Sequence, residues 1–274
     1  MATFNSILIV GCGNMGGAML AGWLAGGVAP GRFTVVDPAL PAAPAGVTLL
    51  RDLPDERFDT ILLGVKPQLF DEVAPKVEPL AGPGVTVFSM MAGVELASLA
   101  ARFPRAAAHV RIMPNLAAAL GKSPLGLAGR GVDDAARAEI EAFLAPLGTG
   151  EWIDEGLFDL VTALAGSGPA FVYRFIDALA SGAENLGMPR AQADRLALAT
   201  VNGAAALAAA SDASPAELAR RVTSPGGTTA AGLAVMDEGG ALAKLVEATL
   251  RAARDRGAEM AAAARSPAPD GRAA

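Results

Sequence analysis

Residues 6–16 read Ser-Ile-Leu-Ile-Val-Gly-Cys-Gly-Asn-Met-Gly, and this stretch decides the class of fold. It begins as a short apolar run that stops at glycines, which is typical of a strand buried on both faces of a parallel sheet. An apolar helix is expected from Asn14 to about Ala25, where Gly26 and Gly27 end it. The chain therefore begins with a buried strand, a glycine-rich turn and a helix.

The glycines of this turn fit the pattern Gly-x-Gly-x-x-Gly at Gly11, Gly13 and Gly16. The first permits a tight turn, the second lets the backbone approach a pyrophosphate, and the third allows close packing of helix on strand. The start of the helix, at Asn14 and Met15, would present unpaired N–H groups to the phosphates. We interpret the motif as a dinucleotide-binding turn; the alternative is a structural turn without a ligand.

Asp37 ends the second predicted strand, 33–37. An acid at this place commonly accepts hydrogen bonds from the adenosine ribose and repels a 2′-phosphate, which favours NADH over NADPH. The alternative is a surface-turn residue before Pro38. Both NADH and NADPH therefore stay open as the cofactor.

Two further segments are candidates for the cofactor site because they follow predicted strands, at the carboxyl edge of the sheet where ligands bind. The candidate residues are Gly64, Val65, Lys66 and Pro67 after the third strand, and Ala92 and Gly93 after the fourth. The ammonium group of Lys66 could offset cofactor charge, or it could simply be solvated.

Apolar runs alternate with helical segments through the first half of the chain. Strands are predicted at 6–10, 33–37, 60–65, 85–88, 107–112 and 125–128, and helices at 14–25, 68–80, 94–102 and 133–145. This alternation predicts an α/β domain over residues 1–154, with a parallel sheet covered by helices on both faces.

The pattern after residue 154 is helical. Helices are predicted at 156–165, 169–187, 190–210, 215–222, 228–238 and 240–264, so residues 155–264 form an all-α domain. Residues 201–210 are apolar nearly all round, and such a helix must be buried on most sides. We therefore predict a homodimer through the C-terminal helices. Residues 265–274 contain two prolines and mixed polar residues, and are predicted to be a disordered tail.

Charge and composition exclude other classes of partner. The formal net charge is −6 and no basic cluster occurs, which argues against nucleic-acid binding. No charged residue precedes Arg32, but glycines interrupt that stretch, so we expect no membrane span. Cys12 is the single cysteine and no intramolecular disulfide can form, which fits a reducing, cytoplasmic location.

Two loops in the helical half stand out. Residues 165–169, Ala-Gly-Ser-Gly-Pro, open a long predicted helix, with Pro169 suited to its first turn. The second loop, 223–229, precedes another helix, and its candidate substrate-binding residues are Ser224, Gly226, Gly227, Thr228 and Thr229. Exposed N–H groups and hydroxyls at a helix start form a pocket for a carboxylate or phosphate. The alternative is an interhelical turn, for which one glycine and a cap residue would suffice.

Along almost its whole length the chain resembles the pyrroline-5-carboxylate reductases. The matching segments are Gly-Cys-Gly-Asn-Met-Gly (11–16), Val-Lys-Pro (65–67), Arg-Ile-Met-Pro-Asn (111–115), Thr-Ala-Leu-Ala-Gly-Ser-Gly-Pro-Ala (162–170), Gly-Met-Pro-Arg (187–190) and Val-Thr-Ser-Pro-Gly-Gly-Thr-Thr (222–229). The last segment is the most distinctive of the family.

The resemblance implies an N-terminal Rossmann domain, an all-α dimerisation domain and, in some members, rings of dimers. It implies reduction of the cyclic imine Δ1-pyrroline-5-carboxylate to L-proline by NADPH or NADH, the last step of proline biosynthesis. It also implies that the loop at 224–229 holds the substrate carboxylate, and that Thr229 matches a residue that hydrogen-bonds the ring nitrogen.

Three features depart from the family pattern. Ala165 stands where serine is usual, and Met90 and Met91 replace smaller residues before Ala92. Neither change affects the reaction class. Asp37 is less expected in members that prefer NADPH, which leaves the cofactor preference open.

Few side chains could supply the proton that imine reduction requires. His109, the single histidine, lies in a predicted strand and is interpreted as a core or edge residue, and Tyr173 lies in a helix. A neutral threonine is a poor acid. The hypothesis is therefore that Thr229 orients the substrate and relays a proton from water, or holds an iminium that is already protonated. Arg111 and Asn115 either shape the active site or are structural.

Two other functions are alternative interpretations of the sequence. A β-hydroxyacid dehydrogenase shares the two-domain plan, but it places a catalytic lysine on the helix after its glycine-rich segment, where this chain has only Arg174. A catalytically silent dinucleotide-binding protein would not need the second, hydroxyl-rich loop.

Overall fold

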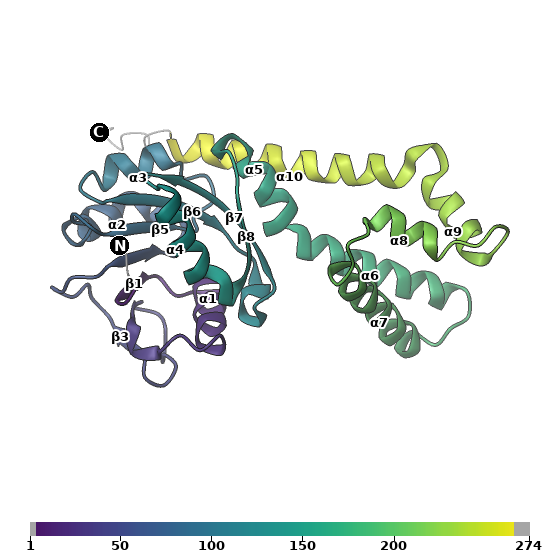
Figure 1. Ribbon diagram of the computed structural model, residues 1–274, viewed down its shortest axis with the longest axis horizontal. Helices are drawn as coiled ribbons and strands as arrows, with labels where there is room; N and C mark the ends of the chain where they lie inside the picture. The colour runs from purple at the N-terminus through teal and green to yellow at the C-terminus, as the bar shows by residue number, and fades with distance from the viewer. Residues whose placement is uncertain (1–3, 266–274) are drawn as a thin grey trace, which may run out of the picture. The chain divides into compact units, whose positions relative to one another are not determined.

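The computed structural model describes residues 4–265, and its internal contacts divide the chain into two compact units (Figure 1). Among the described residues, the first unit comprises those up to Ser167 together with those from Ala252 onward, and the second comprises Gly168–Arg251. Residues 155–167 thus group with the first unit by their contacts, although the sequence-based boundary lies between 154 and 155.

The first unit is built on an eight-stranded sheet in the order β3-β2-β1-β4-β5-β6-β7-β8. The strands are β1 Ile7–Val10, β2 Phe33–Val36, β3 Thr48–Leu50, β4 Thr60–Leu63, β5 Thr86–Ser89, β6 Ala108–Met113, β7 Ser123–Arg130 and β8 Gly148–Trp152. The order of the first six is 3-2-1-4-5-6, that of the dinucleotide-binding Rossmann fold. The predicted α/β class is confirmed.

The sheet differs from the prediction at three strands. β6 and β7 pair antiparallel, because the connection 114–122 is too short for the crossover that parallel strands need. β3 and β8 were not predicted. β3 has only three residues, and β8 reads Gly-Thr-Gly-Glu-Trp at the edge of the sheet, so neither carries an apolar run.

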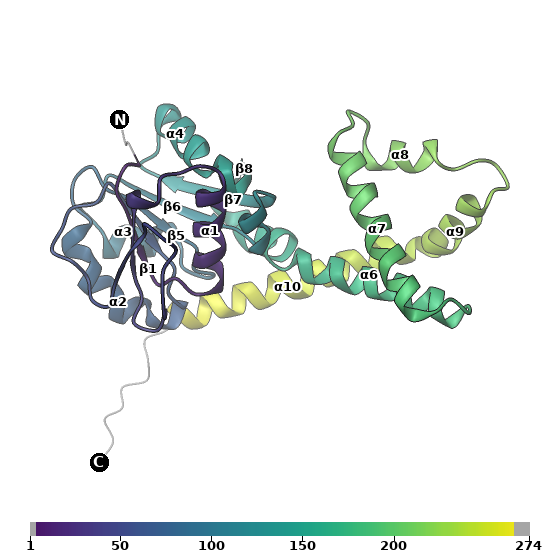
Figure 2. The same ribbon diagram turned by 90° about the horizontal axis from the view of Figure 1, so that it is seen from below.

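Helices cover both faces of this sheet (Figure 2). α2 Phe70–Val77, α3 Leu96–Arg102 and α5 Phe158–Val161 contribute to one buried cluster, and α1 Asn14–Ala25 and α4 Asp134–Leu144 contribute to the other. Along β1 the side chains alternate between the clusters: Leu8 and Val10 belong to the first, Ile7 and Ile9 to the second. The strand that carries the glycine-rich turn is therefore buried on both faces, as its apolar run predicts.

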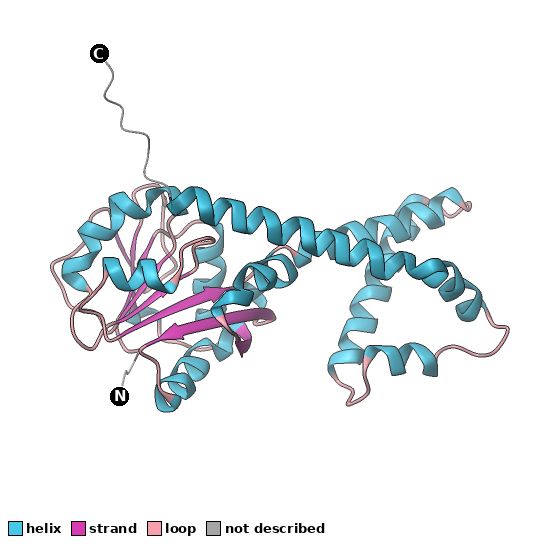
Figure 3. Ribbon diagram, turned by 90° about the horizontal axis from the view of Figure 1, so that it is seen from above, coloured by secondary structure: helices cyan, strands magenta, loops and turns pink. Residues whose placement is uncertain are grey.

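The second unit is helical (Figure 3). It contains α6 Gly168–Asn185, α7 Arg190–Ala209, α8 Pro215–Arg221, α9 Thr228–Asp237 and the first part of α10 Ala241–Arg265. α6 packs against α7, and Arg190 joins them through Asp177 on α6 and Asp194 on α7, both at 2.7 Å. These carboxylates raise the pKa of Arg190. The Gly-Met-Pro-Arg segment therefore has a structural explanation.

The apolar stretch predicted to be buried, residues 201–210, is largely exposed within the chain. Among the described residues one helical stretch, 155–185, is also long and apolar enough to cross a membrane, judged by length and composition alone. α10 continues through Arg265, the first residue of the predicted tail, and the rest of that prediction lies outside the described residues.

Candidate active site

The glycine-rich turn follows β1 at the carboxyl edge of the sheet and packs against the turn that follows β4. Gly11 has φ +85°, and a Cβ placed on it would lie 2.9 Å from the backbone nitrogen of Val65. A Cβ on Gly64 would lie 2.3 Å from the carbonyl oxygen of Gly11. The structure thus brings together two predicted segments, 11–16 and 64–67, through a contact that only glycine permits.

The second and third glycines have the surroundings that a dinucleotide requires. A Cβ on Gly13 would meet nothing within 4 Å, so this side of the turn is open. Gly13 precedes α1 without a side-chain cap, so no side chain caps the first N–H groups of α1, at Asn14 and Met15. Gly16 lies close to the carbonyl oxygen of Gly11, 3.1 Å from the ideal Cβ position. The turn therefore fits a pyrophosphate.

Asp37 has a structural role that the sequence did not reveal. Its Oδ2 accepts a hydrogen bond from the backbone N–H of Cys12 at 2.8 Å, inside the glycine-rich turn. Burial, with a contribution from the charge of Asp37, raises the pKa of the Cys12 thiol to about 11. Cys12 is therefore protonated at neutral pH and unreactive, and Asp37 fixes the turn in addition to any contact with ribose.

The remaining predicted cofactor residues lie in turns at the same edge of the sheet. Lys66 is exposed at the start of the short helical turn Pro67–Leu69. Gly93 has φ +76° in the turn after β5, beside the half-buried Ala92. Met90, one of the family departures, lies beside Gly64, with its Cε 3.4 Å from that glycine's ideal Cβ position. Met90 therefore packs against the cofactor turn.

The predicted substrate loop belongs to the second unit and turns sharply before α9. Gly226 has φ +70°, and the N–H of Gly227 donates to the carbonyl oxygen of Ser224 at 3.0 Å. A Cβ on Gly227 would lie 2.5 Å from the hydroxyl oxygen of Ser224. α9 starts at Thr228 without a side-chain cap, so the N–H groups of its first turn stay available to a ligand.

Arg111 and Asn115 have structural contacts. Arg111 is buried on β6, where its Nη1 lies 2.9 Å from Oε1 of Glu155 and its guanidinium carbon lies 3.8 Å from the ring centroid of Phe158. Asn115 donates through Nδ2 to the carbonyl oxygen of Ala165 at 3.0 Å. Both residues fix segment 155–167, where the predicted helix 156–165 is replaced by α5 between the short turns Glu155–Leu157 and Thr162–Gly166, the latter with π geometry.

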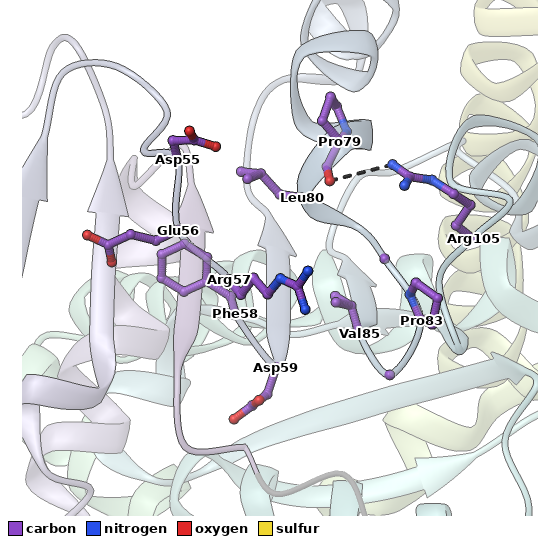
Figure 4. A pocket seen from close by; sticks show the side chains of 12 residues that line it. Asp55, Glu56, Arg57, Phe58, Asp59, Pro79, Leu80, Pro83, Val85 and Arg105 are labelled. Atoms are coloured by element: carbon purple, nitrogen blue, oxygen red, sulfur yellow. Dashed lines mark hydrogen bonds between the residues drawn. The ribbon is translucent and has the colours of Figure 1, made fainter.

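One cavity lies elsewhere. It measures about 440 Å³ and is lined by segments 55–59 and 79–85 together with Arg105 (Figure 4). These segments precede β4 and β5, so the cavity opens at the amino edge of the sheet. None of the predicted site residues lines it.

The sheet order, the open glycine-rich turn and the second, helical unit together define a two-unit dinucleotide-dependent oxidoreductase. Comparison with known proteins gives the family. The family model described as pyrroline-5-carboxylate reductase dimerisation matches residues 155–260. The pyrroline-5-carboxylate reductase of Pseudomonas aeruginosa is 36% identical over 269 residues, covering 93% of this chain and 96% of the relative. The chain belongs to the pyrroline-5-carboxylate reductase family.

Solved structures agree with this assignment. A pyrroline-5-carboxylate reductase from Coxiella burnetii superposes with a TM-score of 0.86 at 30% identity, covering 94% of this chain and 99% of the other. The pyrroline carboxylate reductase of Plasmodium falciparum, solved with NADP bound, has a TM-score of 0.79 at 23% identity over 93% and 98% of the two chains. The second likeness supports the fold.

Proposed function

We propose that this chain reduces Δ1-pyrroline-5-carboxylate to L-proline with NADH or NADPH, the last step of proline biosynthesis. The observation that carries the proposal is the loop 224–229, in which hydroxyls and free N–H groups surround the start of α9. A site for a small carboxylate has this chemistry. The same segment is the most distinctive match to the family.

The residues proposed for the cofactor belong to the first unit, and those proposed for the substrate belong to the second. The glycine-rich turn and the start of α1 would hold the pyrophosphate, and segments 64–67 and 92–93 would line the rest of the cofactor site. The bound nicotinamide supplies the hydride, and the protein orients and polarises the substrate. Ser224, Gly226, Gly227 and Thr228 would hold the carboxylate, while Thr229 would orient the ring nitrogen.

The position of His109 argues against this residue as the proton donor. This residue lies near the amino end of β6, away from the carboxyl edge where the glycine-rich turn lies. It is buried, its Nε2 is 3.0 Å from the carbonyl oxygen of Phe103, and burial lowers its pKa. His109 is therefore unsuited to donate the proton, which supports delivery from water through Thr229 or binding of a protonated iminium.

The test is steady-state oxidation of NADH and NADPH with Δ1-pyrroline-5-carboxylate, beside a 3-hydroxy acid assay in the reverse direction. We expect turnover only with the imine. Thr229→Ala should lower kcat by about 100-fold, the usual contribution of a group that acts on proton transfer, while cofactor affinity stays nearly constant. Thr249→Ala is the matched control, because the Thr249 hydroxyl donates to the carbonyl of Leu245 within α10. Turnover of Thr229→Ala within a few-fold of the parent would rule out this role.

We also propose that the enzyme is a homodimer through its C-terminal helices, assembled further into rings of dimers, and that it is cytoplasmic. The support is the exposed apolar surface of the second unit, in which Leu186 is 91% and Leu207 60% exposed within a single chain. Light scattering should give at least twice the chain mass, and a monomer at micromolar concentration would refute the assembly. Cell fractionation checks the location, which rests on the single free cysteine.

A further inference from the structure

The loop after β2 is held from both sides by charged groups. On one side, Asp37 accepts three backbone hydrogen bonds, from Cys12 to Oδ2 at 2.8 Å and from Ala39 and Leu40 to Oδ1 at 2.8 and 3.1 Å. On the other side, Nη1 of Arg51 lies 2.8 Å from the carbonyl oxygen of Asp37, 3.2 Å from that of Pro38 and 2.6 Å from that of Leu40. Arg51 directly follows β3, the strand next to β2. The conformation of loop 37–40 is therefore fixed.

The loop lies where the adenosine ribose binds in this fold, at the carboxyl end of the second strand. A carboxylate has about four acceptor positions, and the three backbone bonds leave Asp37 about one for a ribose hydroxyl. A 2′-phosphate has no proton to donate there at neutral pH, and it would lie against the carboxylate charge. Asp37 is half-buried and cannot turn away without releasing three N–H groups.

Arg51 brings the opposite charge to the same loop. Its side chain is exposed, and among the hydrogen bonds and ion pairs of residues 4–265 it donates only through Nη1. Nε and Nη2 are thus left as donors on a side chain that is hydrogen-bonded to loop 37–40. A guanidinium with two free donor nitrogens is well suited to a phosphate.

We propose that Asp37 and Arg51 together set the cofactor preference: the Asp37 carboxylate selects NADH, and without it the Arg51 guanidinium binds the 2′-phosphate of NADPH. This inference rests on the proposed nicotinamide-dependent function. It assigns Arg51, which no sequence motif indicated, to the adenosine end of the cofactor site.

The first experiment measures equilibrium binding of NADH and NADPH to the full-length protein by fluorescence titration, without substrate. The parent should bind NADH more tightly by about 10- to 100-fold, the range that one hydrogen bond to a charged group provides. Asp37→Ser should reverse the order. A structural role for Asp37 alone would weaken both cofactors equally. Asp37→Asn is the second variant, because its amide oxygen can still accept from Cys12 if the serine variant does not fold.

The role of Arg51 is tested in the Asp37→Ser background. Adding Arg51→Gln should remove about tenfold or more of the gained NADPH affinity and affect NADH less. Arg57→Gln is the matched control, since it removes the same charge at the amino edge of the sheet. NADPH preference in the parent, equal losses for both cofactors in the Asp37 variants, or equal effects of the two arginine changes would overturn the proposal.

These binding measurements separate the two hypotheses. Tight, selective cofactor binding without turnover of the imine would contradict the proposed reaction and leave the cofactor inference standing. Turnover of the imine with the opposite cofactor preference would contradict the cofactor inference and leave the proposed reaction standing.

Discussion

The two units of this chain differ most in what they bury. In the first unit, two clusters of buried side chains cover the two faces of the sheet and include Trp23, Phe33, Phe88 and Phe103. In the second unit, the buried cluster among the described residues consists of Ala180, Ala193 and Ala197. Three alanines bury little apolar area, and burial of apolar area is the main contribution to folding.

This difference indicates that the first unit has a complete hydrophobic core within one chain and that the second does not. Large apolar side chains on α6, α7 and α10 stay exposed, and contiguous patches of this kind mark protein interfaces. Coverage by a second copy would supply the missing core. The second unit would then be stabilised by association, and its stability would depend on protein concentration.

The largest expected effect tests the core of the first unit. Trp23→Ala should lower the free energy of unfolding by about 3–5 kcal/mol, because Trp23 is buried, stacks on Phe143 and donates from Nε1 to the Phe143 carbonyl at 2.8 Å. Chemical denaturation measures the loss, which should be the same at all protein concentrations. A loss that varies with concentration would show that this core also depends on a partner.

The next prediction tests the second unit. Leu207→Glu should raise the dissociation constant of the dimer by about 30-fold or more, as for a central interface residue, because a charge would be placed on the apolar surface of α7. Leu120→Glu is the control, since Leu120 is 77% exposed in the first unit. Sedimentation across a concentration series measures both. Similar dissociation constants for the two variants would contradict an interface built from the C-terminal helices.

A smaller effect tests how closely the first unit is packed around α1. A Cβ on Gly22 would lie 2.1 Å from the carbonyl oxygen of Ala118, whereas a Cβ on Gly17 in the same helix would meet nothing within 4 Å. Gly22→Ala should therefore lower the free energy of unfolding by about 1–3 kcal/mol. Gly17→Ala should raise it by up to about 1 kcal/mol, because alanine has the higher helix propensity. Thermal and chemical unfolding compare the two. Equal stabilities would mean that α1 can move away from Ala118 at little cost.

The smallest expected effect is a pH dependence from His109 in the first unit. Burial lowers its pKa below the usual 6.5, so the unfolded chain takes up a proton at a higher pH than the folded chain. The contribution of neutral His109 to stability should therefore be fully present above a pH of about 6.5 and should fall as the pH drops below it. Denaturation at pH 5.5, 6.5 and 7.5, with His109→Gln as the comparison, measures this. Identical pH profiles for the two proteins would exclude the effect.

Prediction from the sequence succeeded where one periodic pattern determined the outcome. The run at Ile7–Val10 predicted a doubly buried strand, and the glycines after it predicted the turn and α1. It failed for β3 and β8, because edge strands are short and need no continuous apolar run. It also missed the π turn at Thr162–Gly166, which accepts a hydrogen bond from the distant amide of Asn115.

In the candidate site, too, some residues could be predicted from the sequence and others could not. Gly11, Gly13 and Gly16 could be assigned from spacing alone, because they belong to one contiguous motif, and Gly11 has the positive φ that favours glycine. The roles of Glu155 and Arg51 could not, since their partners lie 44 and 11 to 14 residues away.

The sequence by itself determined the fold class, the cofactor turn and the family, because these depend on local periodicity and on short motifs whose residues are contiguous. Only the tertiary structure decided that Asp37 is held by three backbone amides, that Arg51 lies across the same loop, and that the second unit leaves its apolar helices uncovered. The physical reason is that hydrogen bonds and burial are set by neighbours in space, and neighbours in space are fixed only when the whole chain has folded.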